Sequence, residues 1–246
     1  MTDTETRAAD DLTLRLDGRS VIVTGAASGI GRRTAELFVE AGATVTACDI
    51  NPIEAATPHG ELKPIVGDVG DEDYVEAVVA AAGATTPLSA IIHCAGIFDG
   101  PGLDADISVW RKVIDTNLTS GFLFLKHGIP RIEEAGGGAI VLIGSVSGIN
   151  GGYKSGPAYA ASKAGVHGLV KWAARRYAPT GVTVNAVAPG TIATPMSAAA
   201  VVPTKLTPLG HAGDPLDIAR AALYLASPAG SFVTGTVMVV DGGMTI

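Results

Sequence analysis

Short apolar runs and longer amphipathic segments follow one another along most of the chain. Residues 20–23 form a β-branched run that ends at Thr24-Gly25, and residues 32–41 then place apolar side chains at helical spacing. The same succession predicts further strands at residues 44–48, 64–66, 90–93, 139–143, 183–187 and 236–240, and further helices at residues 71–82, 107–134, 158–178 and 216–226. Strands separated by helices form right-handed parallel crossovers. The pattern therefore predicts an α/β fold, a doubly wound parallel sheet covered by helices in three layers.

Composition supports one such domain. Hydrophobic residues make up 47% of the 246 residues and aromatic residues only 5%, so the core consists mainly of Ala, Val, Ile and Leu, as suits a buried parallel sheet. No linker or repeat is visible, because the glycines at 136–138 fall where a helix would end before a strand. We expect a flexible N-terminal tail over residues 1–11 and a single domain over residues 12–246.

Charge and cysteine usage narrow the class of protein. The net charge of −7 and pI near 5.1 argue against a nucleic-acid or membrane partner, which would need a basic face. Cys48 and Cys94 end apolar runs, which indicates buried thiols and a cytoplasmic protein. We expect no signal peptide, no membrane span and, because the five histidines lack ligand spacing, no metal.

The first predicted strand leads into a glycine-rich turn, Thr24 to Gly31, with the sequence TGAASGIG. Glycines allow the backbone to approach a pyrophosphate, and the N-terminus of the next helix offers free N–H groups to it. A strand before the turn and a helix after it are the context that a dinucleotide fingerprint requires.

Asp49 ends the next strand, where a carboxylate accepts hydrogen bonds from the adenosine ribose and repels a 2′-phosphate. This favours NAD over NADP. The alternative is a turn-forming aspartate before Asn51, and Arg32 and Arg33 are counter-evidence because either could contact a 2′-phosphate.

Tyr159 and Lys163 are four residues apart in the Ala-rich helix, so their side chains lie on one face. A nearby cation lowers the pKa of a tyrosine, and Tyr159 could then act as a general acid or base. The pair alone would more often be a surface aromatic beside a solvated lysine. Ser145, at the end of the fifth main strand, should share the cofactor's side of the sheet and orient a substrate oxygen.

Together these features resemble the short-chain dehydrogenase/reductase family, from about Leu14 to Gly243. Its landmarks occur in order: the turn 24–31, Gly67-Asp68-Val69, Asn117, Ser145, Tyr159-x-x-x-Lys163, the segment 185–190 (NAVAPG) and Asp241-Gly242-Gly243. The resemblance implies a single-domain Rossmann fold and a homotetramer, assembled through the two long helices and the C-terminal segment.

The resemblance also implies roles for individual residues. The catalytic set would be Asn117, Ser145, Tyr159 and Lys163: Tyr159 transfers the proton, Ser145 holds the substrate oxygen, Lys163 binds the nicotinamide ribose and lowers the Tyr159 pKa, and Asn117 holds a water. The cofactor-binding residues would be Gly25, Ser28, Gly29, Ile30, Gly31, Asp49, Asp68, Val69, Ala95, Gly96, Tyr159, Lys163, Pro189, Gly190, Ile192 and Thr194.

Three features depart from the family pattern. Cys94 stands in place of the usual asparagine, the stretch from Ser145 to Tyr159 is one residue longer than is common, and the segment 190–210 is short. The last feature predicts a small or open lid over the substrate.

The expected activity is hydride transfer between NAD(H) and a neutral secondary alcohol or ketone. The predicted substrate lining is apolar: Phe98, Val146, Ile149, Met196 and residues 198–202. A 3-oxoacyl-(acyl-carrier-protein) reductase using NADPH is the alternative, disfavoured because Glu133 and Glu134 stand where basic residues would meet an acidic carrier. A non-catalytic dinucleotide sensor on the same fold is a third hypothesis.

Overall fold

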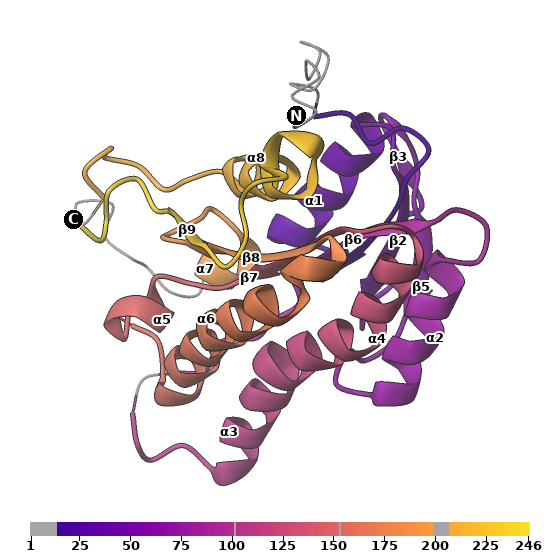
Figure 1. Ribbon diagram of the computed structural model, residues 1–246. Coiled ribbons are helices and arrows are strands. Elements are labelled where there is room, and N and C mark those ends of the chain that lie inside the picture. The colour runs from indigo at the N-terminus through magenta and orange to yellow at the C-terminus, as the bar shows by residue number, and fades with distance from the viewer. Residues whose placement is uncertain (1–13, 101, 153, 199–206) are drawn as a thin grey trace.

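A seven-stranded parallel sheet forms the centre of the protein (Figure 1). The computed structural model describes residues 14–100, 102–152, 154–198 and 207–246, so the predicted tail 1–11 lies outside the described residues. The strand order is β5-β2-β1-β6-β7-β8-β9. The strands are β1 (Ser20–Thr24), β2 (Thr44–Asp49), β5 (Lys63–Val66), β6 (Leu88–His93), β7 (Gly138–Ile143), β8 (Val182–Pro189) and β9 (Val237–Val240). The predicted doubly wound parallel sheet is confirmed.

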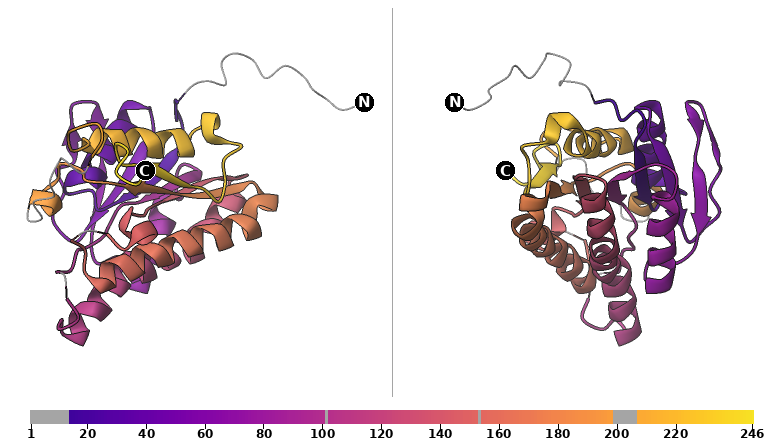
Figure 2. Two further views of the ribbon diagram at one scale, coloured as in Figure 1. Left: turned by 90° about the vertical axis from the view of Figure 1, so that its left-hand side faces the viewer. Right: turned by 45° about the vertical axis from the view of Figure 1, so that its right-hand side comes forward.

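Helices cover both faces of this sheet. Helices α1 (Gly29–Glu40) and α8 (Pro215–Ala226) pack against each other on one face, and α2 (Glu72–Ala82), α4 (Ser120–Glu134) and α6 (Pro157–Tyr177) cover the other. In Figure 2 the yellow α8 and the orange α6 lie on opposite sides of the strands. Each layer has its own apolar core, because a central strand such as β1 is buried on both faces. The three-layer, single-domain prediction therefore holds.

The predicted helix over residues 107–134 has the right ends but is interrupted. Helix α3 (Ile107–Ile114) passes into a π-helical turn, η2 (Asp115–Thr119), before α4 begins. A π-turn inserts one extra residue into a helix, and such insertions are frequent at functional sites. Here the turn contains Asn117, whose buried side chain bonds both the N–H and the carbonyl of Ile97.

Several short elements were not predicted. Strands β3 (Ala56–Thr57) and β4 (Gly60–Glu61) pair as a small hairpin, and single turns of helix form α5 (Ser147–Asn150), α7 (Pro195–Ala198), η3 (Ala178–Thr180) and η5 (Pro228–Gly230). Elements this short carry too few residues to show a period. The first helix also begins at Gly29 rather than residue 32, because the glycine turn itself enters the helix.

The connection between strands changes direction beside β1, which pairs with β2 on one side and with β6 on the other. In open α/β sheets a crevice forms beyond the carboxyl ends of the strands at such a point. The strand ends that meet there are Thr24, Asp49, His93, Ile143 and Pro189. The order of the strands therefore decides where a ligand can bind.

Within the described residues, no helix combines the length and apolar character needed to cross a membrane.

Candidate active site

A cavity of about 520 Å³ lies beyond the carboxyl ends of the strands. Its wall contains every residue predicted to bind the cofactor, together with Ser145, Tyr159 and Lys163. Asn117 is the exception, since it is buried behind the wall. Tertiary structure thus brings together predicted cofactor-binding residues that lie up to 169 positions apart in sequence, from Gly25 to Thr194.

The glycine turn is shaped to receive a ligand closely. Gly31 approaches the turn so tightly that a Cβ there would lie 2.1 Å from the carbonyl oxygen of Gly25. The N-cap residue Ser28 makes no side-chain hydrogen bond to the first turn of α1. The amide groups at this helix end therefore face the cavity without a side-chain cap, which suits a pyrophosphate.

A buried hydrogen-bond chain fixes the loop after β6. The Thr24 hydroxyl accepts hydrogen bonds from the Cys94 and Ala95 amides and also contacts His93 Nδ1 at 2.9 Å. His93 Nε2 contacts the Ser120 hydroxyl at 2.8 Å, and this hydroxyl in turn donates to the Thr116 carbonyl in the π-turn. Burial lowers the pKa of His93 to about 3, so the ring is neutral. Sequence analysis assigned no role to His93, although a histidine at the end of an apolar strand is a signal of buried polar pairing.

The Cys94 backbone amide donates to the Thr24 hydroxyl. Its thiol is a weaker hydrogen-bonding group than the asparagine side chain that is usual at this position. Burial raises the pKa of the thiol to about 12, so Cys94 stays protonated at neutral pH. With cysteine at this position, the Cys94 and Ala95 amides both bond the Thr24 hydroxyl.

Asp49 lies at the cavity end nearest the glycine turn. Its carboxylate accepts hydrogen bonds from the amides of Ala27 and Asn51, at 3.0 and 2.9 Å. It therefore forms the turn that the alternative interpretation expected and still lines the cavity. One carboxylate oxygen can accept more than one hydrogen bond, so the two roles are compatible.

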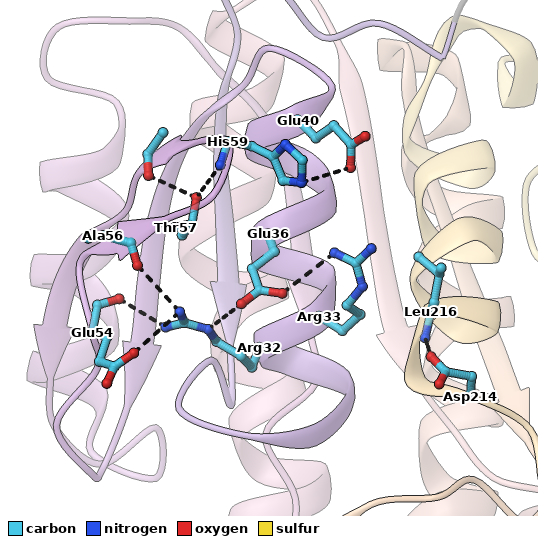
Figure 3. A network of polar contacts seen from close by, with 11 residues as sticks. Arg32, Arg33, Glu36, Glu40, Glu54, Ala56, Thr57, His59, Asp214 and Leu216 are labelled. Atoms are coloured by element: carbon cyan, nitrogen blue, oxygen red, sulfur yellow. Dashed lines mark hydrogen bonds and ion pairs between the residues drawn. The ribbon is translucent and has the colours of Figure 1, made fainter.

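The two arginines that follow the turn are engaged elsewhere (Figure 3). Arg32 donates to Glu36 at 2.7 Å and to the Glu54 carbonyl at 2.9 Å, and Arg33 pairs with Glu36 at 3.5 Å. The described cavity wall includes neither arginine. These contacts hold Arg32 against the stretch that leads into β3.

Ser145 and Tyr159 meet at the other end of the cavity. The Ser145 Oγ accepts the Ser147 amide at 3.1 Å, which leaves its hydrogen free to donate toward Tyr159 or a substrate oxygen. Burial raises the pKa of Tyr159, and the hydrogen bond with Ser145 lowers it again in part.

Lys163 lies beside Tyr159 but bonds to another group. Its Nζ donates to the Ile143 carbonyl at 2.7 Å and lies 5.6 Å from the centre of the Tyr159 ring. Burial lowers the pKa of Lys163 itself to about 8. Burial is the largest influence on the pKa of both side chains, and the lowering of the Tyr159 pKa by Lys163 stays a prediction.

The Asn117 side chain connects the π-turn to α6, the helix that carries Tyr159 and Lys163. Its amide donates to the Ser162 hydroxyl at 3.1 Å, and Ser162 donates to the Tyr159 carbonyl at 2.7 Å. The Asn117 Oδ1 and the Lys163 Nζ both approach Gly96, at 3.3 and 3.5 Å from where a Cβ there would lie. The water that the resemblance assigns to Asn117 stays a prediction.

The substrate end is more polar than the sequence predicted. Phe98, Val146 and Met196 line it, but Ile149 does not: its side chain is half exposed on α5. Residues 199–202 of the predicted lining lie outside the described residues, as do residues 203–206 of the segment expected to form a small lid. The unpredicted polar members are Ser147, Asn150, Lys154 and Ser155. They come from the loop between Ser145 and Tyr159, whose path a sequence pattern cannot give.

Within the described part of the chain, no three side chains of His, Cys, Asp or Glu group as metal ligands do. A dinucleotide-sized cavity over a glycine turn, with a Tyr-Ser-Lys group at its far end, defines a nicotinamide-dependent oxidoreductase as the class of protein.

Comparison with known proteins identifies the family. A family model described as enoyl-(acyl carrier protein) reductase matches residues 25–245. A cis-4-hydroxycyclohexanecarboxylate dehydrogenase from Sinomonas cyclohexanicum is 40% identical over 243 residues, 92% of this chain and 96% of that protein. A 3-oxoacyl-(acyl-carrier-protein) reductase from Thermotoga maritima is 38% identical, over 95% of this chain and 100% of that protein.

A solved structure agrees. A putative NAD(P)-dependent gluconate 5-dehydrogenase from Beutenbergia cavernae, with bound NADP at low occupancy, superposes with a TM-score of 0.88 at 34% identity, over 94% of this chain and 98% of that one. The chain belongs to the short-chain dehydrogenase/reductase family, and it is an NAD(P)-dependent oxidoreductase.

Proposed function

We propose that the protein interconverts a secondary alcohol and its ketone with NAD(H), using Tyr159 as general acid and base. The observation that supports this most directly is the convergence of Tyr159, Ser145 and Lys163 on one cavity that also contains the glycine turn. The relatives in the family include a dehydrogenase whose name specifies a cyclic secondary alcohol, which fits this reaction.

The roles of the residues follow from their contacts. When bound, the nicotinamide supplies the hydride acceptor or donor. The Ser145 hydroxyl holds the substrate oxygen by donating its hydrogen, which the bond from the Ser147 amide leaves free. Tyr159 removes the proton from that oxygen during oxidation and returns it during reduction. Lys163 and Asn117 complete the proposed site, with Lys163 near the ribose and Asn117 anchoring the turn beneath it.

We infer that NAD is the preferred cofactor. Asp49 puts a negative charge on the wall beside the glycine turn, and a 2′-phosphate there would be repelled. The arginines that could offset this charge are held by Glu36 and by residues near β3 (Figure 3). The similar structure with bound NADP makes NADP the competing cofactor in every assay.

The substrate we propose is a small molecule with an apolar body. Phe98, Val146 and Met196 offer apolar contact, while Ser147 and Asn150 offer hydrogen bonds near the reacting oxygen. Cyclohexanol, cis-4-hydroxycyclohexanecarboxylate and the matching ketones form a suitable first panel, each assayed with NAD(H) and NADP(H).

Reduction of a 3-oxoacyl thioester on a carrier protein is the second candidate, favoured by the 38% identical reductase. Glu133 and Glu134 end α4 where we expected a basic contact for an acidic carrier, which disfavours it. Turnover of acetoacetyl thioesters with NADPH, exceeding that of every alcohol in the panel, would reverse this ranking.

Tyr159→Phe tests the proposed chemistry. We expect this variant to lose about 10²–10⁴-fold in turnover, the range of general acid–base catalysis, and to bind NAD as the wild type does. Tyr177→Phe is the matched control, because it removes a hydroxyl from the far end of the same helix, outside the cavity. Full activity of Tyr159→Phe would end the proposal, and NAD binding by a wild type that turns over no substrate would favour a sensor.

We also propose a cytoplasmic homotetramer formed through α4, α6 and the C-terminal segment. Phe122 on α4 and Trp172 on α6 expose 48% and 60% of their surface, and Val239 on β9 exposes 41%. Apolar surface of this kind is typical of interfaces. Sedimentation at the mass of one 24.7 kDa chain would refute this assembly.

A further inference from the structure

The helix that carries Tyr159 receives its N-terminal cap from another part of the chain. Gly156, the N-cap residue of α6, has no side chain to offer, and Pro157 has no N–H group. The next two amides, of Ala158 and Tyr159, donate to the two carboxylate oxygens of Asp99, at 3.2 and 3.0 Å. Asp99 is 59 and 60 residues away from them in sequence, and it is only 4% exposed.

Gly156 and Asp99 are complementary in shape. A Cβ at Gly156 would lie 2.2 Å from an Asp99 carboxylate oxygen and 2.3 Å from the carbonyl oxygen of Gly100. The Gly156 amide in turn donates to the Asp99 carbonyl at 3.2 Å. A glycine stands at the N-cap because the carboxylate that caps the helix occupies the space where a capping side chain would start.

The loop that contains Asp99 is itself fixed to the cavity. The Thr24 hydroxyl accepts hydrogen bonds from the first two amides of this loop, those of Cys94 and Ala95. The Asn117 side chain bonds the N–H and the carbonyl of Ile97. Phe98, next to Asp99, packs against the Tyr159 ring, with 4.9 Å between ring centres and 58° between ring planes. The position of the first turn of α6 is therefore set by residues of the β6 loop, which also lines the cavity.

We propose that Asp99 is a positioning residue that fixes the Tyr159 hydroxyl relative to Ser145. The inference rests on the proposed role of Tyr159 in proton transfer. Lys163 lies one turn further along α6 and is bonded to Ile143, so loss of the cap releases the turn carrying Tyr159 before it affects Lys163. Misplacement of a reacting group by about 1 Å can cost 10²-fold in rate, and a frayed first turn allows such a shift.

Asp99→Ala and Asp99→Asn provide the test, with Asp71→Ala as matched control. Asp71 caps α2 in the same manner, by accepting the amides of Asp73 and Tyr74, and α2 contributes no residue to the cavity wall. We expect Asp99→Ala to lower kcat by about 10- to 100-fold while the Kd for NAD stays unchanged. Asp99→Asn keeps one acceptor oxygen and should fall between Asp99→Ala and the wild type. Asp71→Ala should lose stability but keep the wild-type kcat.

Amide hydrogen exchange gives a second readout that needs no substrate. Exchange at the amides of Ala158 and Tyr159 should become faster in Asp99→Ala, while those of Asp73 and Tyr74 change only in Asp71→Ala. A kcat for Asp99→Ala equal to that of the wild type, or a loss shared equally by Asp71→Ala, would overturn the positioning role. If Tyr159→Phe keeps its activity in the same assays, the proposed function fails, whatever the result for Asp99.

Discussion

Replacing Asp49 by Asn should weaken the discrimination against NADP. The change keeps the size of the side chain and removes the charge. Ala27 and Asn51 donate to different oxygens of Asp49, so the one oxygen of Asn keeps one of these two contacts. A 2′-phosphate carries about two negative charges, and at about 4 Å each interacts with a carboxylate by about 1 kcal/mol at the dielectric constant of water. Asp49 is only partly buried, so the water-like value of about 2 kcal/mol in total is the safe lower bound. That corresponds to about 30-fold in specificity.

The assay is kcat/KM with NAD and with NADP for one alcohol, in the wild type and in Asp49→Asn. We expect the wild type to favour NAD and the variant to reduce the ratio by about 30-fold, mainly through a lower KM for NADP. Asp71→Asn is the control for net charge, because it removes the same charge outside the cavity. An unchanged ratio in Asp49→Asn, or a wild type that favours NADP, would refute the reasoning from Asp49 and the engaged arginines.

Two further predictions concern the cofactor turn and stability. Gly31→Ala should abolish tight NAD binding and lower the free energy of unfolding by about 1–3 kcal/mol, because the new Cβ would overlap the Gly25 carbonyl. Gly168→Ala, which has open space around it, should raise the free energy of unfolding by about 0.5–1 kcal/mol. Calorimetric titration measures the binding and urea unfolding the stability, and normal NAD binding by Gly31→Ala would contradict the close contact between Gly31 and Gly25. His93 has a pKa of about 3 when folded against about 6.5 when unfolded, so its contribution is complete above pH 6.5 and is lost as the pH falls toward 3. Between pH 7.5 and 5 the wild type should lose about 2 kcal/mol more than His93→Gln in urea unfolding, and equal losses would show that His93 is charged in the folded protein.

Much of the fold follows from local pattern. Buried strands such as β1 and β7 are continuous apolar runs, and the helices between them are long enough to show their period. The hairpin β3–β4 and the one-turn helices were missed because they contain too few residues to show a repeating pattern of apolar and polar positions. The π-turn was missed because residues 107–134 keep a helical pattern throughout, and the extra residue at Asn117 is stabilised by contacts with Ile97 and Ser162, both far away in sequence.

The residues of the site were predictable as types at given spacings, whereas their electrostatics were not. Spacing placed Tyr159 and Lys163 on one helical face, but the direction of the Tyr159 pKa shift depends on burial and on the direction in which the lysine points. Similarly, Arg32 and Glu36 are spaced to pair within α1, whereas only the packing of α1 against the stretch before β3 shows that Arg32 is also bonded to Glu54.

The sequence by itself therefore predicted the parallel sheet, the glycine turn and the Tyr159–Lys163 pair, because each is visible in a local pattern of residues. Tertiary structure alone decided what surrounds that group: the neutral His93 behind the β6 loop, the polar substrate end, and Asp99 at the start of α6. Contacts across some 60 residues leave no periodic signal in one sequence, since they depend on which strands become neighbours in the sheet.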